Sequence, residues 1–224
     1  MCGRYAATAK PGELVEEYEI DFVDDLGPAA SPRWNIAPTM PIATVLVDDR
    51  DGHETRLLTA TRWGLIPPWA KERPMQLINA RVETVAEKPS FRNAIRRRRC
   101  IVPADGYYEW RAEGGRKQPY WLQGATGTLA LAGIFEFHRF DDLWVRTTAI
   151  LTTEATDEFG WVHDRMPLVV HADSRDAWLD PTSTDPVEAL AGLEEPRLLR
   201  ATAVTTAVNK VGNEGPELLT PVGE

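Results

Sequence analysis

Two strand-forming segments meet at a turn in the stretch Cys100-Ile101-Val102-Pro103-Ala104-Asp105-Gly106-Tyr107-Tyr108-Glu109-Trp110. The first segment is apolar, and Asp105-Gly106 is a common turn pair. We therefore expect Cys100 to be buried as a small hydrophobic side chain. In the aromatic segment, burial could raise the pKa of Glu109 into the range that acid–base chemistry needs. The alternative is that strand alternation turns Glu109 toward water.

Outward from this stretch, short apolar segments predict a sheet with few helices. The expected strands cover residues 2–8, 42–47, 56–62, 100–104, 119–123, 128–137, 144–152 and 201–206. The expected helices cover residues 11–19, 89–97, 173–179 and 186–191. Many short strands with short connections predict an α+β fold, with a mostly antiparallel, barrel-like curved sheet and peripheral helices. The sequence shows no internal repeat, so we expect a single domain over residues 1–224.

Prolines predict two irregular segments, residues 33–39 and residues 63–69. A turn is also expected around Asp48 to Gly52, between two paired strands. Tryptophans stand at both ends of the second irregular segment. We expect Trp63 in the core, whereas Trp69 fits equally a core position or a surface on which a base stacks.

The composition fits a globular protein. Of its 224 residues, 43% are hydrophobic, which is enough for a substantial core. There is neither a secretory signal nor an apolar run of the roughly 20 residues that a membrane helix needs. With only two cysteines we expect a reduced, cytoplasmic protein without a disulfide. The cysteines and the four histidines lack metal-ligand spacing, so we expect no metal. We also expect no other cofactor, no membrane partner and a monomer.

Charge is unevenly distributed along the chain. The net charge is −9, yet residues 56–117 contain 14 Lys and Arg against 6 Asp and Glu. A basic middle segment can attract phosphates while the rest keeps the protein soluble. The densest part is Arg96-Arg97-Arg98-Arg99. Such a run is most often a solvated face.

The first residues, Met1-Cys2-Gly3-Arg4, hold the most distinctive chemistry. If Met1 is removed, Cys2 has a thiol and a free α-amine on adjacent carbons. The α-amine has an ordinary pKa near 7.7–8.0, so a useful fraction is neutral at physiological pH. The amine can condense with an aldehyde, and the thiol can then close a five-membered thiazolidine ring. The alternative is that these residues simply begin a strand.

Two further polar segments contain candidate residues for ligand binding and for acid–base chemistry. Asn79 can both donate and accept hydrogen bonds, and with Arg81 it would suit a sugar–phosphate ligand. The alternative is a turn asparagine beside a surface arginine. His163 is followed by Asp164 and Arg165, which could tune it as an acid or base. A lone loop histidine is more often not catalytic.

Together these segments resemble the SRAP family, the SOS response-associated peptidase proteins that act on abasic sites in DNA. The resemblance covers most of residues 2–170 in the family's order. Its motifs are Cys2-Gly3-Arg4, Trp34-Asn35-Ile36-Ala37-Pro38, Trp63-Gly64-Leu65-Ile66-Pro67, Asn79-Ala80-Arg81, Arg99-Cys100-Ile101-Val102-Pro103, Gly106-Tyr107-Tyr108-Glu109-Trp110, Ala132-Gly133-Ile134 and His163-Asp164-Arg165-Met166-Pro167.

The resemblance implies that the chain binds single-stranded DNA containing abasic sites. Cys2 would form a thiazolidine crosslink with the ring-opened sugar, after autoproteolytic or peptidase-type removal of Met1. Glu109 and His163 would transfer protons, and Asn79 would hold the sugar or orient Cys2. The resemblance assigns DNA binding to Arg4, Trp69, Arg81 and Arg165.

Two other functions fit parts of the sequence. An N-terminal-nucleophile cysteine amidohydrolase or peptidase would also begin with a processed Cys-Gly. Such an enzyme would have a layered fold with long alternating strands and helices. A noncatalytic single-strand binder would explain the arginines and tryptophans, but it would leave Cys2 and Glu109 without a role.

Overall fold

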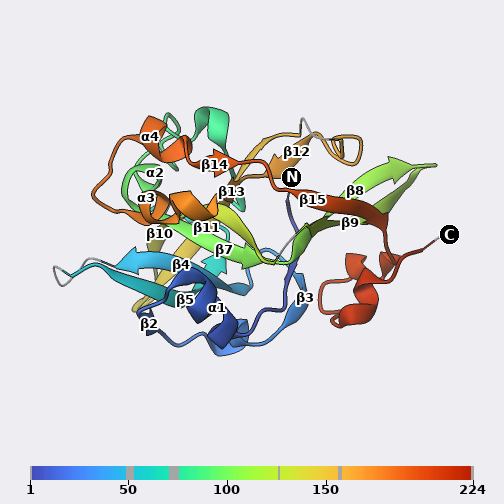
Figure 1. Cartoon of the computed structure of the whole chain (residues 1–224), viewed down its shortest axis with the longest axis horizontal. Helices are drawn as coiled ribbons and strands as arrows, with labels where there is room; N and C mark the ends of the chain where they lie inside the picture. Colours follow the sequence, from blue (N-terminus) through green and yellow to red (C-terminus); the bar gives the residue numbers. More distant parts are fainter. Residues whose placement is uncertain (1, 49–52, 71–75, 126, 156–157, 223–224) are drawn as a thin grey trace.

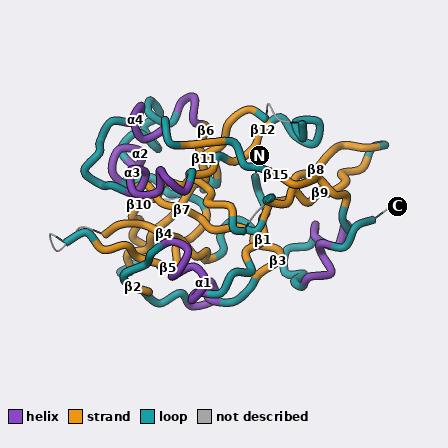
Figure 2. The backbone as a smooth tube through the Cα atoms, in the orientation of Figure 1, coloured by secondary structure: helices purple, strands orange, loops and turns teal. Residues whose placement is uncertain are grey.

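The computed structural model describes residues 2–48, 53–70, 76–125, 127–155 and 158–222. Strands form the body of the molecule, and short helices lie toward its surface (Figure 1). Figure 2 shows the same arrangement, with strand segments running through the middle of the chain trace. The predicted α+β fold with a mostly antiparallel sheet core is therefore confirmed.

Five strands close into a barrel. In their order around the ring they are β11 (Leu143–Glu154), β5 (Thr55–Trp63), β4 (Pro41–Asp48), β7 (Arg99–Ala104) and β10 (Leu129–Phe140). The pairing of β10 with β11 closes the ring, and only the pair of β11 with β5 is parallel. One buried cluster combines strand side chains such as Val45, Leu58 and Ile101 with side chains of the helical segments. Other strand side chains, such as Ile42, Trp63 and Val102, belong to a second cluster that includes Cys2.

A second sheet of five strands lies beside the barrel. Its order is β15 (Leu198–Ala203), β9 (Arg116–Gly124), β8 (Gly106–Glu113), β1 (Tyr5–Ala7) and β3 (Arg33–Ile36). The chain passes from the barrel into this sheet at Asp105, between β7 and β8. Gly106 is needed at this crossing, since a Cβ there would lie 2.4 Å from the carbonyl oxygen of Leu122. The turn therefore joins two sheets and does not form a hairpin.

Short strands extend the barrel sheet. They are β2 (Phe22–Val23), β6 (Asn79–Arg81), β12 (Arg165–Pro167), β13 (Val169–Val170) and β14 (Leu193–Glu194). Two of them, β6 and β12, pair with β11. These pairings place Asn79 and the segment after His163 beside the same barrel strand, β11, although the two are far apart in the sequence.

The helices are short. They are α1 (Pro11–Tyr18), α2 (Ala94–Arg97), α3 (Arg175–Leu179) and α4 (Pro186–Leu190). Single 3₁₀ turns cover Gly27–Ala30, Val82–Thr84, Ala172–Ser174, Thr206–Asn209 and Pro216–Leu219.

Several predicted boundaries differ from the structure. The helix expected at residues 89–97 begins only at Ala94, after a series of turns. The segment expected to be irregular from residue 33 forms β3 before its proline, since strand β1 offers it a hydrogen-bonding edge. The turn expected around Asp48 to Gly52 falls mostly outside the described residues.

The arginine run is only partly exposed: Arg96 and Arg97 face the solvent as expected, whereas Arg98 is half-buried and Arg99 is buried. Arg99 is only 3% exposed. Its guanidinium donates to backbone carbonyls of Ile95, Arg96, Trp178, Asp180 and Ser183. A buried guanidinium needs acceptors for its N–H groups, and the carbonyls around α2 and α3 supply them. The interpretation of the run as a solvated face is wrong for Arg99.

Candidate active site

Cys2 is fully buried at the start of the chain, just before β1. The side-chain nitrogen Nδ2 of Asn79 donates a 2.9 Å hydrogen bond to the backbone oxygen of Cys2. Asn79 is held in turn by the parallel pairing of β6 with β11, where it stands opposite Ile150. Of the two roles considered for Asn79, this contact supports the orientation of Cys2.

A cavity of about 540 Å³ reaches this end of the chain, since Arg4, two residues after Cys2, is one of its lining residues. It is lined by Arg4, Glu109, Trp110, Lys117, His163 and Asn209. A smaller pocket shares Glu109 and His163 with it and also touches Arg165. The structure therefore brings together three of the residues selected from the sequence, Arg4, Glu109 and His163, around one space.

Glu109 lies on β8 and is only 3% exposed. Burial raises the pKa of its carboxyl group to about 7, because the charged form is poorly solvated, and the charge of Asp164 adds to the effect. The alternative that strand alternation exposes Glu109 is wrong, since side chains from β9 and from the segment around His163 cover this face of the strand. A carboxyl group with a pKa near 7 can both give and accept protons at physiological pH.

Cys2 and Glu109 influence each other electrostatically. The pKa of the Cys2 thiol is raised, first by burial and then by the charge of Glu109. The thiol is therefore protonated until a neighbouring group accepts its proton. The carboxyl group of Glu109 therefore lies within electrostatic range of the Cys2 thiol.

His163 precedes β12 and is partly buried. Burial lowers the pKa of its imidazole, so the neutral form is favoured. Its Nδ1 atom accepts a 3.0 Å hydrogen bond from the backbone N–H of Arg165. Nδ1 also lies 2.9 Å from a carboxylate oxygen of Asp164, but an atom that accepts from an N–H cannot donate to that oxygen as well. The ring proton of the neutral imidazole therefore sits on Nε2.

The guanidinium of Arg4 is hydrogen-bonded to two residues distant in the sequence, one of them near the C-terminus. Its Nη1 atom donates to Oδ1 of Asn35 at 2.6 Å and to the backbone oxygen of Val208 at 2.8 Å. Its guanidinium also lies 5.7 Å from the ring centroid of Trp110. Trp110 in turn donates to the side-chain oxygen of Asn209 at 2.6 Å.

Sequence reasoning missed three residues that line the cavity, Trp110, Lys117 and Asn209, and a fourth, Asn35, that holds Arg4. Asn35 is fully buried, and its Nδ2 atom donates to the backbone oxygens of Val208, Lys210 and Asn213. Asn35 and Trp110 stand inside motifs that the sequence did reveal. Nothing local marks Asn209, because its place depends on contacts between the two ends of the chain.

The other three residues assigned to DNA binding, Trp69, Arg81 and Arg165, do not line the larger cavity. Arg165 is 8% exposed and makes a two-point ion pair with Glu83, at 2.6 and 3.0 Å. This pair lowers the pKa of the Glu83 carboxyl group. Arg81 is exposed, and Trp69 is 54% exposed. Neither appears among the described residues that line the two cavities. Trp63 is buried as expected.

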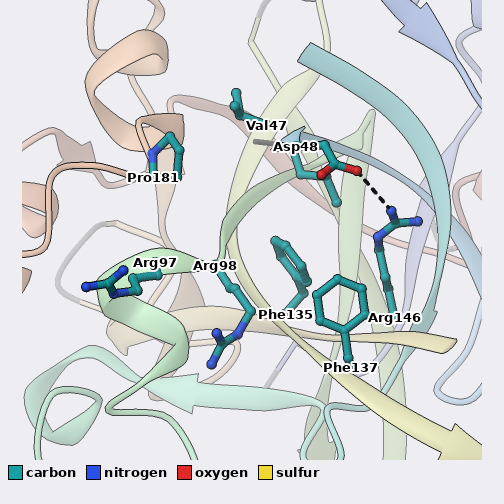
Figure 3. Close-up of a pocket in the computed structure, with 9 residues that line it drawn as sticks. Val47, Asp48, Arg97, Arg98, Phe135, Phe137, Arg146 and Pro181 are labelled. Carbon is teal, nitrogen blue, oxygen red and sulfur yellow. Dashed lines mark ion pairs between the residues drawn. The ribbon is translucent and has the colours of Figure 1, made fainter. Parts of the chain in front are cut away.

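A separate cavity, of about 220 Å³, is lined mainly by residues of the barrel strands (Figure 3). It is lined by Leu46, Val47, Asp48, Arg97, Arg98, Phe135, Phe137, Arg146 and Pro181. Two of its three arginines are engaged with carboxylates, Arg98 with Glu136 at 2.6 Å and Arg146 with Asp48 at 3.6 Å. None of its described lining residues is a nucleophile. The cavity beside Cys2 is therefore the better candidate for chemistry.

No group of three or more His, Cys, Asp and Glu side chains among the described residues could hold a metal ion. Likewise, none of the helices in the described segments has the length and apolar character to cross a membrane.

Comparison with known proteins gives consistent matches. Residues 1–211 match the family described as SOS response associated peptidase (SRAP). The chain is 36% identical over 226 residues to the abasic site processing protein YoqW of Bacillus subtilis, covering 98% of this chain and 99% of YoqW. It is 33% identical over 232 residues to the abasic site processing protein YedK of Escherichia coli, covering 99% of this chain and 100% of YedK.

The fold also matches a solved structure. The crystal structure of a protein from Bacteroides thetaiotaomicron superimposes with a TM-score of 0.80 at 23% sequence identity, covering 99% of this chain and 100% of the other. At this level of identity the likeness concerns the fold alone.

Proposed function

Because this chain belongs to the SOS response associated peptidase (SRAP) family, we propose that it processes abasic sites in single-stranded DNA by forming a covalent bond to the lesion. The names of YoqW and YedK support abasic sites as the substrate. The observation that carries the proposal is the placement of Cys2. Its backbone is held by Asn79, and its thiol is coupled to a carboxyl group whose pKa is about 7.

The reaction requires that Met1, which lies outside the described residues, has been removed. The α-amine of Cys2 then adds to the aldehyde carbon of the open sugar to give a carbinolamine. Loss of one water leaves a Schiff base. The thiol sulfur adds to the same carbon, and its proton passes to the nitrogen. The sum is one aldehyde plus one aminothiol giving one thiazolidine and one water, without an oxidant or reductant.

Glu109 is suited to the proton transfers of this sequence. In its protonated form it donates to the sugar oxygen or to the leaving hydroxyl group of the carbinolamine. In its charged form it accepts the thiol proton, which the raised pKa of Cys2 would otherwise retain. His163, with its proton on Nε2, would hold a sugar hydroxyl group at the same cavity.

Cations around the cavity would bind phosphates. Arg4 and Lys117 line the cavity, so we assign them to the nucleotides nearest the lesion. Arg81 and Trp69 are exposed and would contact the strand farther away, with the Trp69 ring against a base. Arg165 would act through its ion pair with Glu83, which fixes the segment after His163. Phosphate contacts do not depend on the base sequence and should weaken with salt.

The amidohydrolase alternative is less well supported. It would need a layered fold with long helices, whereas the longest helix in the described residues is α1, with 8 residues. The closed barrel and the mostly antiparallel pairing also differ from that architecture.

The test is an intact-mass measurement after mixing the chain with single-stranded DNA that contains one abasic site. We expect one adduct, with the summed mass of protein and DNA minus one water. Because a thiazolidine has no C=N bond, borohydride should not reduce it, whereas it would add two hydrogens to a Schiff base. The Cys2→Ala variant should lose the borohydride-resistant adduct, and Cys100→Ala should keep it. An equal yield of resistant adduct from Cys2→Ala would refute the proposal.

A further inference from the structure

An exposed tryptophan beside the candidate site is held in place by two partners. Trp161 is 46% exposed. The guanidinium carbon of Arg111 lies 4.8 Å from its ring centroid, and the ring of Tyr120 meets it at 5.0 Å with an angle of 87° between the planes. We call Trp161, Arg111 and Tyr120 the aromatic rim.

Glu113 fixes the partners of Trp161. Its carboxylate accepts a 2.8 Å hydrogen bond from the hydroxyl group of Tyr120 and lies 3.4 Å from the guanidinium of Arg111. An exposed aromatic side chain is common by itself. Trp161, in contrast, is held by a cation and a second ring while nearly half of its surface remains exposed to water. Its side chain therefore has less conformational freedom to lose when a ligand binds.

The aromatic rim is continuous with the candidate site. Tyr120 stands directly opposite Glu109 in the pairing of β8 with β9. Arg111 follows Glu109 by two positions on β8, so both point to the same face of the strand. Trp161 precedes His163 by two positions, and Val162 between them lines the pocket shared by Glu109 and His163.

We propose that the aromatic rim binds the nucleotide next to the abasic site, with its base stacked on Trp161 and its phosphate near Arg111. A missing base leaves its neighbour without a stacking partner on one side, so that neighbouring base has a free face to offer. Stacking of a base on an aromatic side chain contributes about 1–3 kcal/mol and tolerates any base. Arg111, on the same strand as Glu109, brings positive charge that suits the phosphate.

This inference rests on the proposed function, because it assumes that the lesion occupies the cavity beside Cys2. The binding test therefore uses DNA that cannot react. Single-stranded DNA with a tetrahydrofuran analogue in place of the abasic sugar has no aldehyde, so wild-type protein can be titrated at equilibrium. Fluorescence anisotropy of labelled DNA gives the Kd.

We expect Trp161→Ala to raise the Kd roughly 5- to 100-fold. Trp161→Phe should restore most of the affinity, because it keeps an aromatic face. The matched control is Trp144→Ala, since Trp144 is 68% exposed on β11 and has no place in the proposal. This control should leave the Kd within about twofold of the wild-type value.

A second DNA makes the assignment specific. In it the base next to the analogue is also removed. If that base stacks on Trp161, the wild-type protein should lose affinity for this DNA, and Trp161→Ala should then lose almost nothing more. Fully additive losses, or a Trp161→Ala variant with wild-type Kd, would overturn the inference.

The two proposals can fail separately. A wild-type Kd for Trp161→Ala together with a normal Cys2-dependent adduct would refute the aromatic rim and leave the proposed function standing. Loss of affinity in Trp161→Ala without any adduct from the wild-type protein would refute the crosslinking reaction and support a stacking surface alone.

Discussion

The two cysteines of this chain share their burial and differ in everything around them. Both are fully buried, and burial raises the pKa of each thiol. Cys100 lies within the barrel on β7, where its sulfur packs against Gly133 of β10. Cys2 lies near a chain end, with its backbone bound by Asn79 and its thiol coupled to Glu109. Burial and thiol pKa therefore do not distinguish Cys2, the cysteine that we propose to react, from Cys100 in the barrel. Chain position and neighbours do.

The largest effect should follow from making Cys2 resemble an internal cysteine. A chain that retains an uncleavable residue before Cys2 keeps the thiol but has an amide in place of the amine. Since an amide does not condense with an aldehyde, we expect the borohydride-resistant adduct to disappear. Intact mass measures the loss, and release of the extra residue by a protease should restore the adduct. Persistent adduct with the residue in place would mean that the thiol alone reacts.

Replacing Glu109 by Gln should have the next largest effect. Without the proton donor and acceptor, we expect crosslinking to slow by about 10²–10⁴-fold. The wild-type rate should also change around pH 7, where Glu109 titrates, and this inflection should vanish in Glu109→Gln. Rates of adduct formation between pH 5.5 and 9 test both statements. An inflection that survives the substitution would assign the titration to another group.

Glu109 should also affect stability, with a definite sign. Its pKa rises from 4.5 in the unfolded chain to about 7 in the folded one, so the folded state holds the proton more tightly. Its contribution to the free energy of unfolding therefore falls as pH rises from about 4.5 to 7, and is constant above that. We expect Glu109→Gln to gain stability over wild type across this window, by at most about 3 kcal/mol. Denaturant titrations at pH 5 and pH 8 would show it.

The anchoring of Arg4, two residues after Cys2, can be weakened at Asn35. Asn35→Ala removes the acceptor of Arg4 and leaves three backbone carbonyls without their donor. We expect a loss of about 2–3 kcal/mol in the free energy of unfolding, together with slower crosslinking. Thermal unfolding and the adduct rate are the measurements. An unchanged adduct rate would mean that the Arg4–Asn35 pair does not position the site.

The smallest effect concerns Cys100 as a packing residue. A Cβ at Gly133 would lie 2.9 Å from the Cys100 sulfur, so Gly133→Ala should cost about 1–2 kcal/mol. The double variant with Cys100→Ala should recover part of that loss, because the sulfur is gone. Adduct yield should stay at the wild-type level in all three variants. Strictly additive destabilisation would show that the two residues do not compete for space.

Strand positions followed from the sequence because they depend on local patterns. The apolar segment ending at Ala104 and the turn after it are where the pattern placed them. The helix expected from residue 89 was too long, since the residues before Ala94 form separate turns. The role of Arg99 was also missed, because its acceptors come from segments near α3 that the local sequence does not reveal.

By itself the sequence determined the class of fold and the family, since both depend on residue type and order. It also predicted an aminothiol at Cys2 once Met1 is removed. It also named Glu109, His163 and Asn79 as candidates. Only the tertiary structure decided that Glu109 is buried with a pKa near 7, that Asn79 bonds the Cys2 backbone, and that Asn209 reaches the same cavity. These properties arise from contacts between residues far apart in the chain, and desolvation depends on which atoms exclude water from a group in the folded molecule.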